Sequence, residues 1–392
     1  MRFIILILFI FTAELSAYSS DEIIGKKLIV HSEIIGEDRP ISIYIPAGIK
    51  KDESLYVIYL LDSQHHFHTV TGIVQSLVDY KQIPQAMVVG IETTNRPRDY
   101  LPKVNGEPKT KFQAFALSKW PDSGQEKFMK FLKQELFPFI EKNYATYPHR
   151  TLIGHSNGGT LALSAMYEYP ELFNNYLAIS ANGWWSSDEV AENSLKLTDE
   201  TRASERLFIS VAGEGGRFYT GTLALLSNME KNKPSNLAWQ FKHYPERSHM
   251  SGILPAVSEG LEYLYDHLNF RITPQLAKYA KISVIKNYYS ELSKQSGFNI
   301  PIPINTYIAF AEQQQINERN EAALNTLIQF TVDYPDLPYA HMSLAQGYTK
   351  SAMFKKAYEN FKLALNVAKR LKLEENTIDA LQDMVNSAQA KL

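Results

Sequence analysis

The chain has 392 residues, of which 45% are hydrophobic and 21% are charged, and its formal net charge is −2 at pH 7. This length and composition allow one large globular domain and a second, smaller one. The near-neutral charge gives no electrostatic reason to expect nucleic acid or an anionic membrane as a partner. The chain has no cysteine, which excludes disulfides, thiolate metal sites and a cysteine nucleophile.

The N-terminal segment differs from the rest of the chain. One arginine precedes an apolar run from Phe3 to Phe11, and small residues follow as far as Ala17. This run is far shorter than the roughly 20 apolar residues that a membrane-spanning helix needs. The pattern predicts a secretory signal peptide over residues 1–17, with an uncleaved anchor as the alternative. We therefore expect an exported protein, periplasmic or secreted, with no stable membrane insertion after cleavage.

Strand-like and helix-like patterns alternate over about residues 25–270, which predicts an α/β domain with a mostly parallel sheet and helices on both faces. The expected strands cover residues 28–34, 40–46, 55–62, 86–92, 150–154, 175–181, 206–213 and 237–245. The expected helices cover residues 66–80, 124–144, 159–170, 222–233 and 253–268. Between the second buried strand and the second helix, residues 93–123 are expected to form a polar loop.

The region 271–392 shows helical periodicity and no strand pattern. Its segments 304–337 and 338–371 resemble each other at a period of 34 residues. Residues such as Ala357 and Phe361 fit the tetratricopeptide pattern, whose stacked helix pairs bind peptides or protein segments. We expect these repeats to bind a protein or peptide partner, or to mediate self-association, with a helical buttress as the alternative.

The eight residues Ile153–Thr160 read IGHSNGGT and contain the pattern G-x-S-x-G around Ser156. The pattern alone is weak, because so short a motif recurs by chance. Here a predicted strand precedes it and a predicted helix follows, as around a serine nucleophile on a sharp turn. We therefore predict Ser156 as the nucleophile and the N–H of Asn157 as one oxyanion donor. The loop after the first buried strand supplies the second donor, Gln64 in preference to Ser63.

A serine hydroxyl needs a histidine to accept its proton at neutral pH. Three histidines lie between the serine turn and the repeats. His249 lies in the loop after the last strand, where the base is expected, whereas His243 lies within a strand and His267 near the end of the closing helix. We predict His249 as the base.

An acid commonly orients the histidine of such a site. Glu214 directly follows the strand over 206–213, at the carboxyl end where acids on this kind of sheet lie. Glu246 and Glu230 are the alternatives. This chemistry requires neither a cofactor nor a metal.

Four stretches of the chain resemble the putative-esterase branch of the α/β-hydrolases, which includes esterase D-like enzymes, feruloyl esterases and siderophore esterases. They read YLLDSQHHF, VVGIETTNRPRDYLP, GQEKFMKFLKQELFPFIEKNYATYPHRTLIGHSNGG and PERSHMSGILPAVSEGL. The resemblance covers roughly residues 25–270 and implies an α/β-hydrolase fold. It departs at Asn157, where Leu or Met is common, and at Ser63, where Gly is usual. Some members of the family work with a Ser-His dyad, so the role of Glu214 stays open.

The remaining polar and aromatic motifs suggest substrate contacts. The run HHFH lacks the helical i, i+4 pair typical of zinc sites, so no metal is predicted and His66 is expected near the pocket mouth. Arg98 is a candidate to hold an anionic or catechol-bearing substrate, with an Arg–Asp99 pair that fixes a loop as the alternative. Trp184 and Trp185 are candidates to stack on an aromatic acyl group, with core packing as the alternative.

Together these patterns predict an exported serine hydrolase that cleaves carboxylic esters of siderophore type or of aromatic acids. Two other functions stay open. One is a catalytically silent hydrolase fold that acts through its repeats, and the other is an acyltransferase with an alcohol acceptor.

Overall fold

The structure is a computed structural model that describes residues 23–49, 53–104, 107–122, 124–183, 185, 192–193, 205–232 and 237–392. The predicted signal peptide and Trp184 lie outside the described residues. Within them, no helix is long and apolar enough to cross a membrane.

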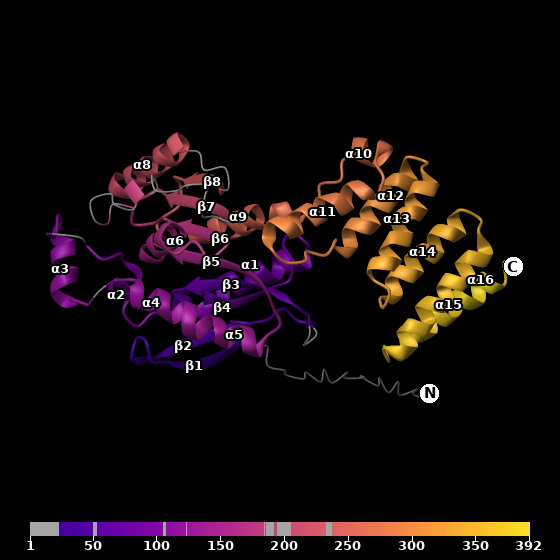
Figure 1. Cartoon of the computed structure of the whole chain (residues 1–392), viewed down its shortest axis with the longest axis horizontal. Coiled ribbons are helices and arrows are strands. Elements are labelled where there is room, and N and C mark those ends of the chain that lie inside the picture. The colour runs from indigo at the N-terminus through magenta and orange to yellow at the C-terminus, as the bar shows by residue number, and fades with distance from the viewer. Residues whose placement is uncertain are drawn as a thin grey trace, which may run out of the picture.

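An eight-stranded sheet forms the centre of the larger region (Figure 1). Its strands are β1 (Lys26–Ser32), β2 (Glu37–Tyr44), β3 (Leu55–Leu61), β4 (Ala86–Ile91), β5 (Thr146–His155), β6 (Asn175–Ile179), β7 (Glu205–Ala212) and β8 (Leu237–Tyr244). The strand order is β1-β2-β4-β3-β5-β6-β7-β8. The pairs β1–β2 and β2–β4 are antiparallel and all the others are parallel. The predicted mostly parallel sheet with a leading antiparallel pair is confirmed.

Helices cover both faces of this sheet. Side chains of a strand alternate between its two sides, and the apolar side chains on both sides are buried under helices. Tyr59 of β3 lies in one hydrophobic core with α4 (Glu126–Phe131), α5 (Phe137–Asn143), α6 (Asn157–Glu168) and α8 (Gly216–Asn232). Its neighbour Ile58 lies in a second core with α1 (Ser63–Asp79) and α9 (Ile253–Tyr265). Strand β3 is buried along its whole length, which is why it appears in the sequence as a continuous apolar run.

The expected loop over residues 93–123 contains two helices, so that prediction was wrong. Helix α2 (Arg96–Tyr100) begins after Asn95, whose side chain accepts a hydrogen bond from the N–H of Arg98. Helix α3 (Lys111–Lys119) begins with a capping box between Thr110 and Gln113. In both cases the cap satisfies N–H groups that a short helix leaves unpaired.

Residues 271–392 form helices joined by short connections and contain no strand, so the predicted helical region is confirmed. It consists of α10 (Pro274–Tyr279), α11 (Ser283–Ser296), α12 (Ile304–Ile316), α13 (Asn320–Asp333), α14 (Pro338–Lys350), α15 (Phe354–Arg370) and α16 (Glu375–Gln389). The pair α14–α15 begins 34 residues after the pair α12–α13, from 304 to 338 and from 320 to 354. Assignment of these helix pairs to the tetratricopeptide class stays a prediction.

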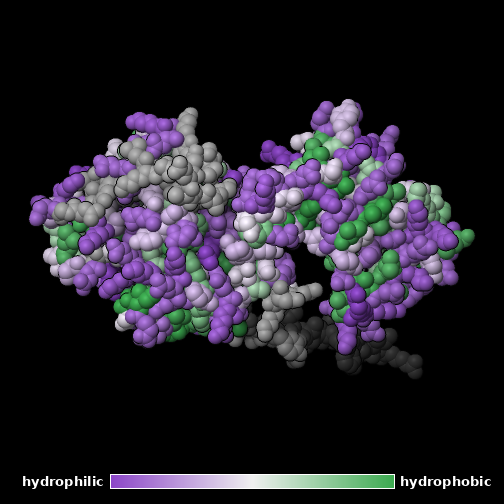
Figure 2. Space-filling model, viewed as in Figure 1, coloured by the Kyte–Doolittle hydropathy of each residue, from purple (hydrophilic) through white to green (hydrophobic). Residues whose placement is uncertain are grey.

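The two regions share part of one core. Tyr289 of α11 and Tyr307 of α12 lie in the same hydrophobic cluster as Tyr265 of α9, and the hydroxyl of Tyr289 donates to the carbonyl of Leu268 at 2.8 Å. A separate cluster holds α12 to α16 together. Figure 2 shows hydrophobic side chains on the outer surface of the helical region.

Candidate active site

Ser156 lies on a strained turn between β5 and α6. Its backbone has φ 60° and ψ −119°, a conformation that residues with a side chain rarely adopt and that clusters at functional sites. The turn closes tightly, since a Cβ added to Gly154 would lie 2.0 Å from the carbonyl oxygen of Gly158. The N–H of Ser156 donates to the carbonyl of Ile179 in β6 at 2.9 Å. The Ser156 hydroxyl forms no hydrogen bond with another described residue and its side chain is partly exposed.

Glu214 and His249 form a close pair at the same edge of the sheet. The distance between His249 Nδ1 and Glu214 Oε1 is 2.7 Å, and the side chains are 31% and 9% exposed, respectively. The pairing follows from the topology, because β7 and β8 are adjacent parallel strands and the two residues lie in the loops after them. The competing acids Glu246 and Glu230 are both exposed to solvent.

The carboxylate of Glu214 is stabilised in its charged form. Burial by itself would raise the pKa of Glu214, but the proximity of Ser180 and the hydrogen bond with His249 outweigh it and lower the pKa below its ordinary value. Ser180 is buried at the end of β6 with φ 43°. An ionised acid beside Nδ1 fixes the tautomer of His249 that leaves Nε2 free to accept a proton.

The two histidines that were set aside in favour of His249 lie elsewhere. His243 is exposed on β8, with its ring 4.8 Å from that of Tyr219. His267 lies after α9 in the short helix Asp266–Leu268, where burial and Arg206 lower its pKa to about 3. Neither residue lies in the loops that carry Glu214 and His249.

Two helix N-termini meet beside the serine turn. Gln64 lies in the first turn of α1 and Asn157 begins α6, where N–H groups lack partners within the helix and the dipole favours negative charge. A Cβ added to Gly158 would lie 3.4 Å from Leu61 and 3.6 Å from Asp62 Oδ2, so the two helix starts are neighbours. The assignment of the N–H groups of Gln64 and Asn157 as oxyanion donors stays a prediction, which the proximity of the two helix starts supports.

The two residues that depart from the family pattern are accommodated. The Ser63 side chain is buried against β4, since a Cβ added to Gly90 would lie 2.6 Å from the Cβ of Ser63. The Asn157 side chain accepts a hydrogen bond from Asn182 at 3.3 Å. Neither side chain takes the place of a backbone donor.

Arg98 and Arg96, both on α2, face different surroundings. Arg98 binds Glu37 at 2.8 Å and Asp99 at 2.7 Å, so its guanidinium fixes the loop and the substrate-binding prediction is corrected. Arg96 instead donates through Nη2 to Asp62 Oδ2 at 2.9 Å and to the carbonyl of His155 at 3.3 Å. The bond to His155, the residue before Ser156, places Arg96 next to the nucleophile, and its side chain is 37% exposed.

Two further residues that were predicted to contact substrate, Trp185 and His66, are buried. Trp185 is 2% exposed and donates through Nε1 to the carbonyl of Pro102 at 2.9 Å, in a small cluster with Phe112. His66 is buried, and its ring lies 5.6 Å from that of His155 at 90°. Trp185 therefore packs in a core, whereas His66 lies beside His155 near the serine turn, and its place at the pocket mouth stays a prediction.

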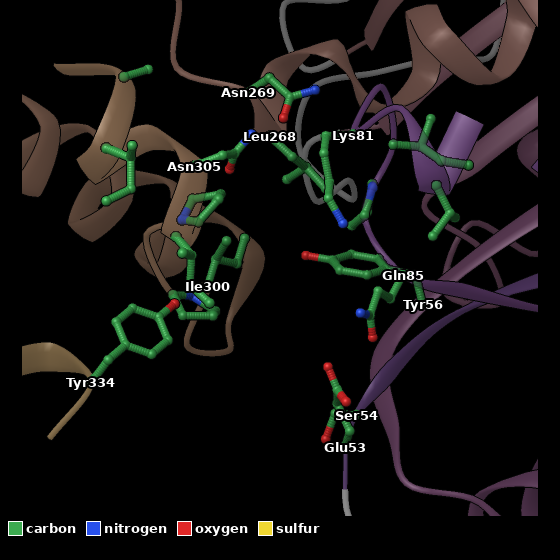
Figure 3. A pocket seen from close by; sticks show the side chains of 18 of the residues that line it. Glu53, Ser54, Tyr56, Lys81, Gln85, Leu268, Asn269, Ile300, Asn305 and Tyr334 are labelled. Atoms are coloured by element: carbon green, nitrogen blue, oxygen red, sulfur yellow. The ribbon is translucent and has the colours of Figure 1, made fainter. Parts of the chain in front are cut away.

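A cavity of about 740 Å³ lies between the two regions, away from the serine turn. Figure 3 shows Tyr56 and Gln85 on one of its sides and Ile300 and Asn305 on the other. Tyr56 and Gln85 lie at the start of β3 and β4, whereas the serine turn lies at the opposite, carboxyl edge of the sheet. The cavity is therefore a separate feature from the catalytic edge.

No described group of three or more His, Asp or Glu residues could hold a metal ion.

His155 and Ser180 are contacts that the sequence analysis missed. His155 Nε2 lies 3.0 Å from the carbonyl oxygen of His249, and Ser180 lowers the pKa of Glu214. The sequence did offer a signal for His155, because it occupies the first x of the G-x-S-x-G motif, directly before Ser156. Ser180 directly follows the buried strand β6, and its residue type carried no separate signal.

A mostly parallel sheet, a strained serine between strand and helix, and a Glu–His pair at the same edge define an α/β-hydrolase. Residues 32–250, more than half of the chain, match the family model described as Putative esterase. The chain belongs to this family and is a carboxylic ester hydrolase.

Two of the relatives that match are named as esterases of iron-bearing compounds. The chain is 31% identical over 156 residues to the ferri-bacillibactin esterase BesA of Bacillus subtilis, covering 36% of this chain and 52% of BesA. It is 25% identical over 201 residues to the iron(III) salmochelin esterase of Escherichia coli, covering 49% of this chain and 44% of that protein. The chain thus spans about half the length of these two relatives.

Solved structures show the same fold. An IroE-like serine hydrolase from Shewanella oneidensis is 25% identical with a TM-score of 0.64, over 77% of this chain and 98% of that one. An uncharacterised protein from Capnocytophaga ochracea has a TM-score of 0.67 at 16% identity, over 93% of this chain and 99% of that one. The second similarity, which shows the fold alone, extends into the helical region.

Proposed function

We propose that the protein is an exported serine esterase that works through an acyl-enzyme, with Ser156 as nucleophile, His249 as base and Glu214 as the orienting acid. The observation that carries this proposal is the 2.7 Å contact between Glu214 Oε1 and His249 Nδ1, at the sheet edge that also bears the strained Ser156. A serine needs this combination, because its hydroxyl is a poor nucleophile without a base held in the correct tautomer.

The reaction has two halves. His249 Nε2 removes the proton of Ser156 while Oγ attacks the ester carbonyl, and the N–H groups of Asn157 and Gln64 hold the oxyanion. The tetrahedral intermediate then collapses, the bond to the leaving alcohol breaks, and His249 returns the proton to that alcohol. Water repeats the sequence on the acyl-enzyme and releases the acid.

The proposed substrates are siderophore-type esters or esters of aromatic acids. This choice is supported by two relatives, whose names describe an esterase of ferri-bacillibactin and an esterase of iron(III) salmochelin. It is also supported by Arg96, a partly exposed guanidinium next to the nucleophile strand. Such a group can bind oxygen atoms in pairs and stack on rings. Export would follow from the signal peptide over residues 1–17, and the helical region would serve a protein partner or self-association.

The experiment is product analysis with three esters: p-nitrophenyl butyrate, a feruloyl ester and a ferric catecholate trilactone. The protein begins at residue 18, and Ser156→Ala serves as the control. The proposal predicts hydrolysis of the trilactone or of the feruloyl ester at higher kcat/KM than p-nitrophenyl butyrate, and none by the control. Turnover of p-nitrophenyl butyrate alone would contradict the substrate class. Formation of a new ester when an alcohol is added, in place of free acid, would identify an acyltransferase.

A further inference from the structure

We propose that His155 is a positioning residue that holds the main chain of His249 at a fixed distance from Ser156. This proposal rests on the proposed function, in which Ser156 and His249 must exchange a proton. It assigns a role to the variable residue of the G-x-S-x-G motif.

His155 contacts the base loop in two ways. It is the last residue of β5, the residue is 5% exposed, and Nε2 lies 3.0 Å from the carbonyl oxygen of His249. The rings of His155 and His249 also lie 4.4 Å apart, at an interplanar angle of 47°. The backbone of His249 is thus bound by one neighbour and its Nδ1 by another, Glu214.

The chemistry of this contact fixes the proton on His155. A backbone carbonyl only accepts hydrogen bonds, so Nε2 of His155 must carry the hydrogen. Burial, with His249 and His66 as smaller contributors, lowers the pKa of His155 to about 3. The ring is therefore neutral above about pH 4, and it donates to His249 without introducing a second positive charge beside the base.

The contact ties the base to the nucleophile through one residue. His155 is covalently joined to Ser156, so a hydrogen bond from His155 to His249 sets the spacing of the two reacting residues. The internal bonds of the base loop, such as Ser248 N–H to Ser251 Oγ at 2.9 Å, hold the shape of the loop. They do not fix its distance from Ser156.

Neighbouring groups hold His155 in turn. The ring of His66, from α1, lies at 90° to its ring, and Arg96 donates to its carbonyl at 3.3 Å. His66, His155 and His249 therefore join the helix start that carries Gln64, the serine turn and the base loop. Displacement of the base by about 1 Å can cost roughly 100-fold in rate.

The test compares two substitutions that separate the ring from its donor. His155→Gln keeps an N–H donor near the position of Nε2, whereas His155→Phe keeps a ring and removes the donor. We expect His155→Phe to lower kcat on p-nitrophenyl butyrate by about 10- to 100-fold with little change in KM. His155→Gln should stay within about fivefold of wild type. His243→Phe, at an exposed histidine, is the matched control, and thermal unfolding shows whether each variant is folded.

A second readout is independent of turnover. Hydrogen exchange of the amides of residues 246–252 should be faster in His155→Phe than in wild type and close to wild type in His155→Gln. Wild-type kcat together with wild-type exchange in His155→Phe would overturn the proposal, as would equal losses in both variants. If the wild type hydrolyses no ester but the exchange pattern holds, the contact stands and the proposed function fails.

Discussion

Replacement of Glu214 by Gln tests whether the site works as a triad. Gln is isosteric with Glu but carries no charge, and its amide can donate to Nδ1 and so favour the wrong tautomer of His249. The carboxylate is 9% exposed and lies 2.7 Å from Nδ1, so its charge faces the imidazolium that forms during the reaction. The substitution therefore removes a stabilisation that is present mainly in the transition state.

The size of the effect follows from Coulomb's law. Two unit charges about 4 Å apart interact by about 4 kcal/mol at an effective dielectric constant of about 20. His249 is 31% exposed, so water screens part of this interaction, and we take about 3 kcal/mol. Since about 1.4 kcal/mol corresponds to a tenfold change in rate, kcat should fall by roughly 100-fold while KM stays near its wild-type value.

The assay is steady-state hydrolysis of p-nitrophenyl butyrate over a range of concentrations. Glu246→Gln is the matched control, because Glu246 is an exposed acid in the same loop as His249. It should leave kcat unchanged. A Glu214→Gln variant within threefold of wild type would refute the triad and indicate a Ser-His dyad.

Three further predictions concern the turn, acid stability and substrate preference. Gly154→Ala should destabilise the fold by about 2–3 kcal/mol in urea unfolding, since its Cβ would lie 2.0 Å from the carbonyl oxygen of Gly158; wild-type stability would contradict the tight turn. Hydrogen bonding to Arg98, followed by Thr94 and Arg39, lowers the pKa of Glu37 from 4.5 to about 2. Its folded pKa lies below its unfolded value, so its contribution is present above about pH 4.5 and lost as the pH falls toward 2. Glu37→Gln should therefore cost stability at pH 7 and almost none at pH 2, and an equal cost at both would exclude this origin. Arg96→Met should lower kcat/KM about tenfold for a catechol-bearing ester and less for p-nitrophenyl butyrate; equal losses would show that Arg96 holds Asp62 and not the substrate.

The sequence was sufficient to predict the strands of the sheet, because most of them are buried on both faces. The runs over 55–62 and 86–92 have no polar interruption, and β3 and β4 coincide with them to within one residue. Helices α2 and α3 escaped prediction, since their formation depends on local caps at Asn95 and Thr110 within an otherwise polar segment.

The limits of the site prediction have a physical cause as well. Arg96 and Arg98 lie two residues apart on a five-residue helix, and their roles are decided by partners that come from distant strands. Arg98 meets Glu37 at the start of β2, and Arg96 meets Asp62 after β3. The partner of His155 is a backbone carbonyl, which has no signature in the sequence.

The measurement that tests the central claim most directly is labelling with a fluorophosphonate probe, followed by peptide mass spectrometry. Wild-type protein from residue 18 and its Ser156→Ala variant are treated alike, and hydrolysis of p-nitrophenyl butyrate is followed in the same samples. We expect one labelled peptide, the one that contains Ser156, with complete loss of label and hydrolysis in Ser156→Ala. Hydrolysis that persists in Ser156→Ala, or a label on another residue, would contradict the assignment of Ser156 as the nucleophile.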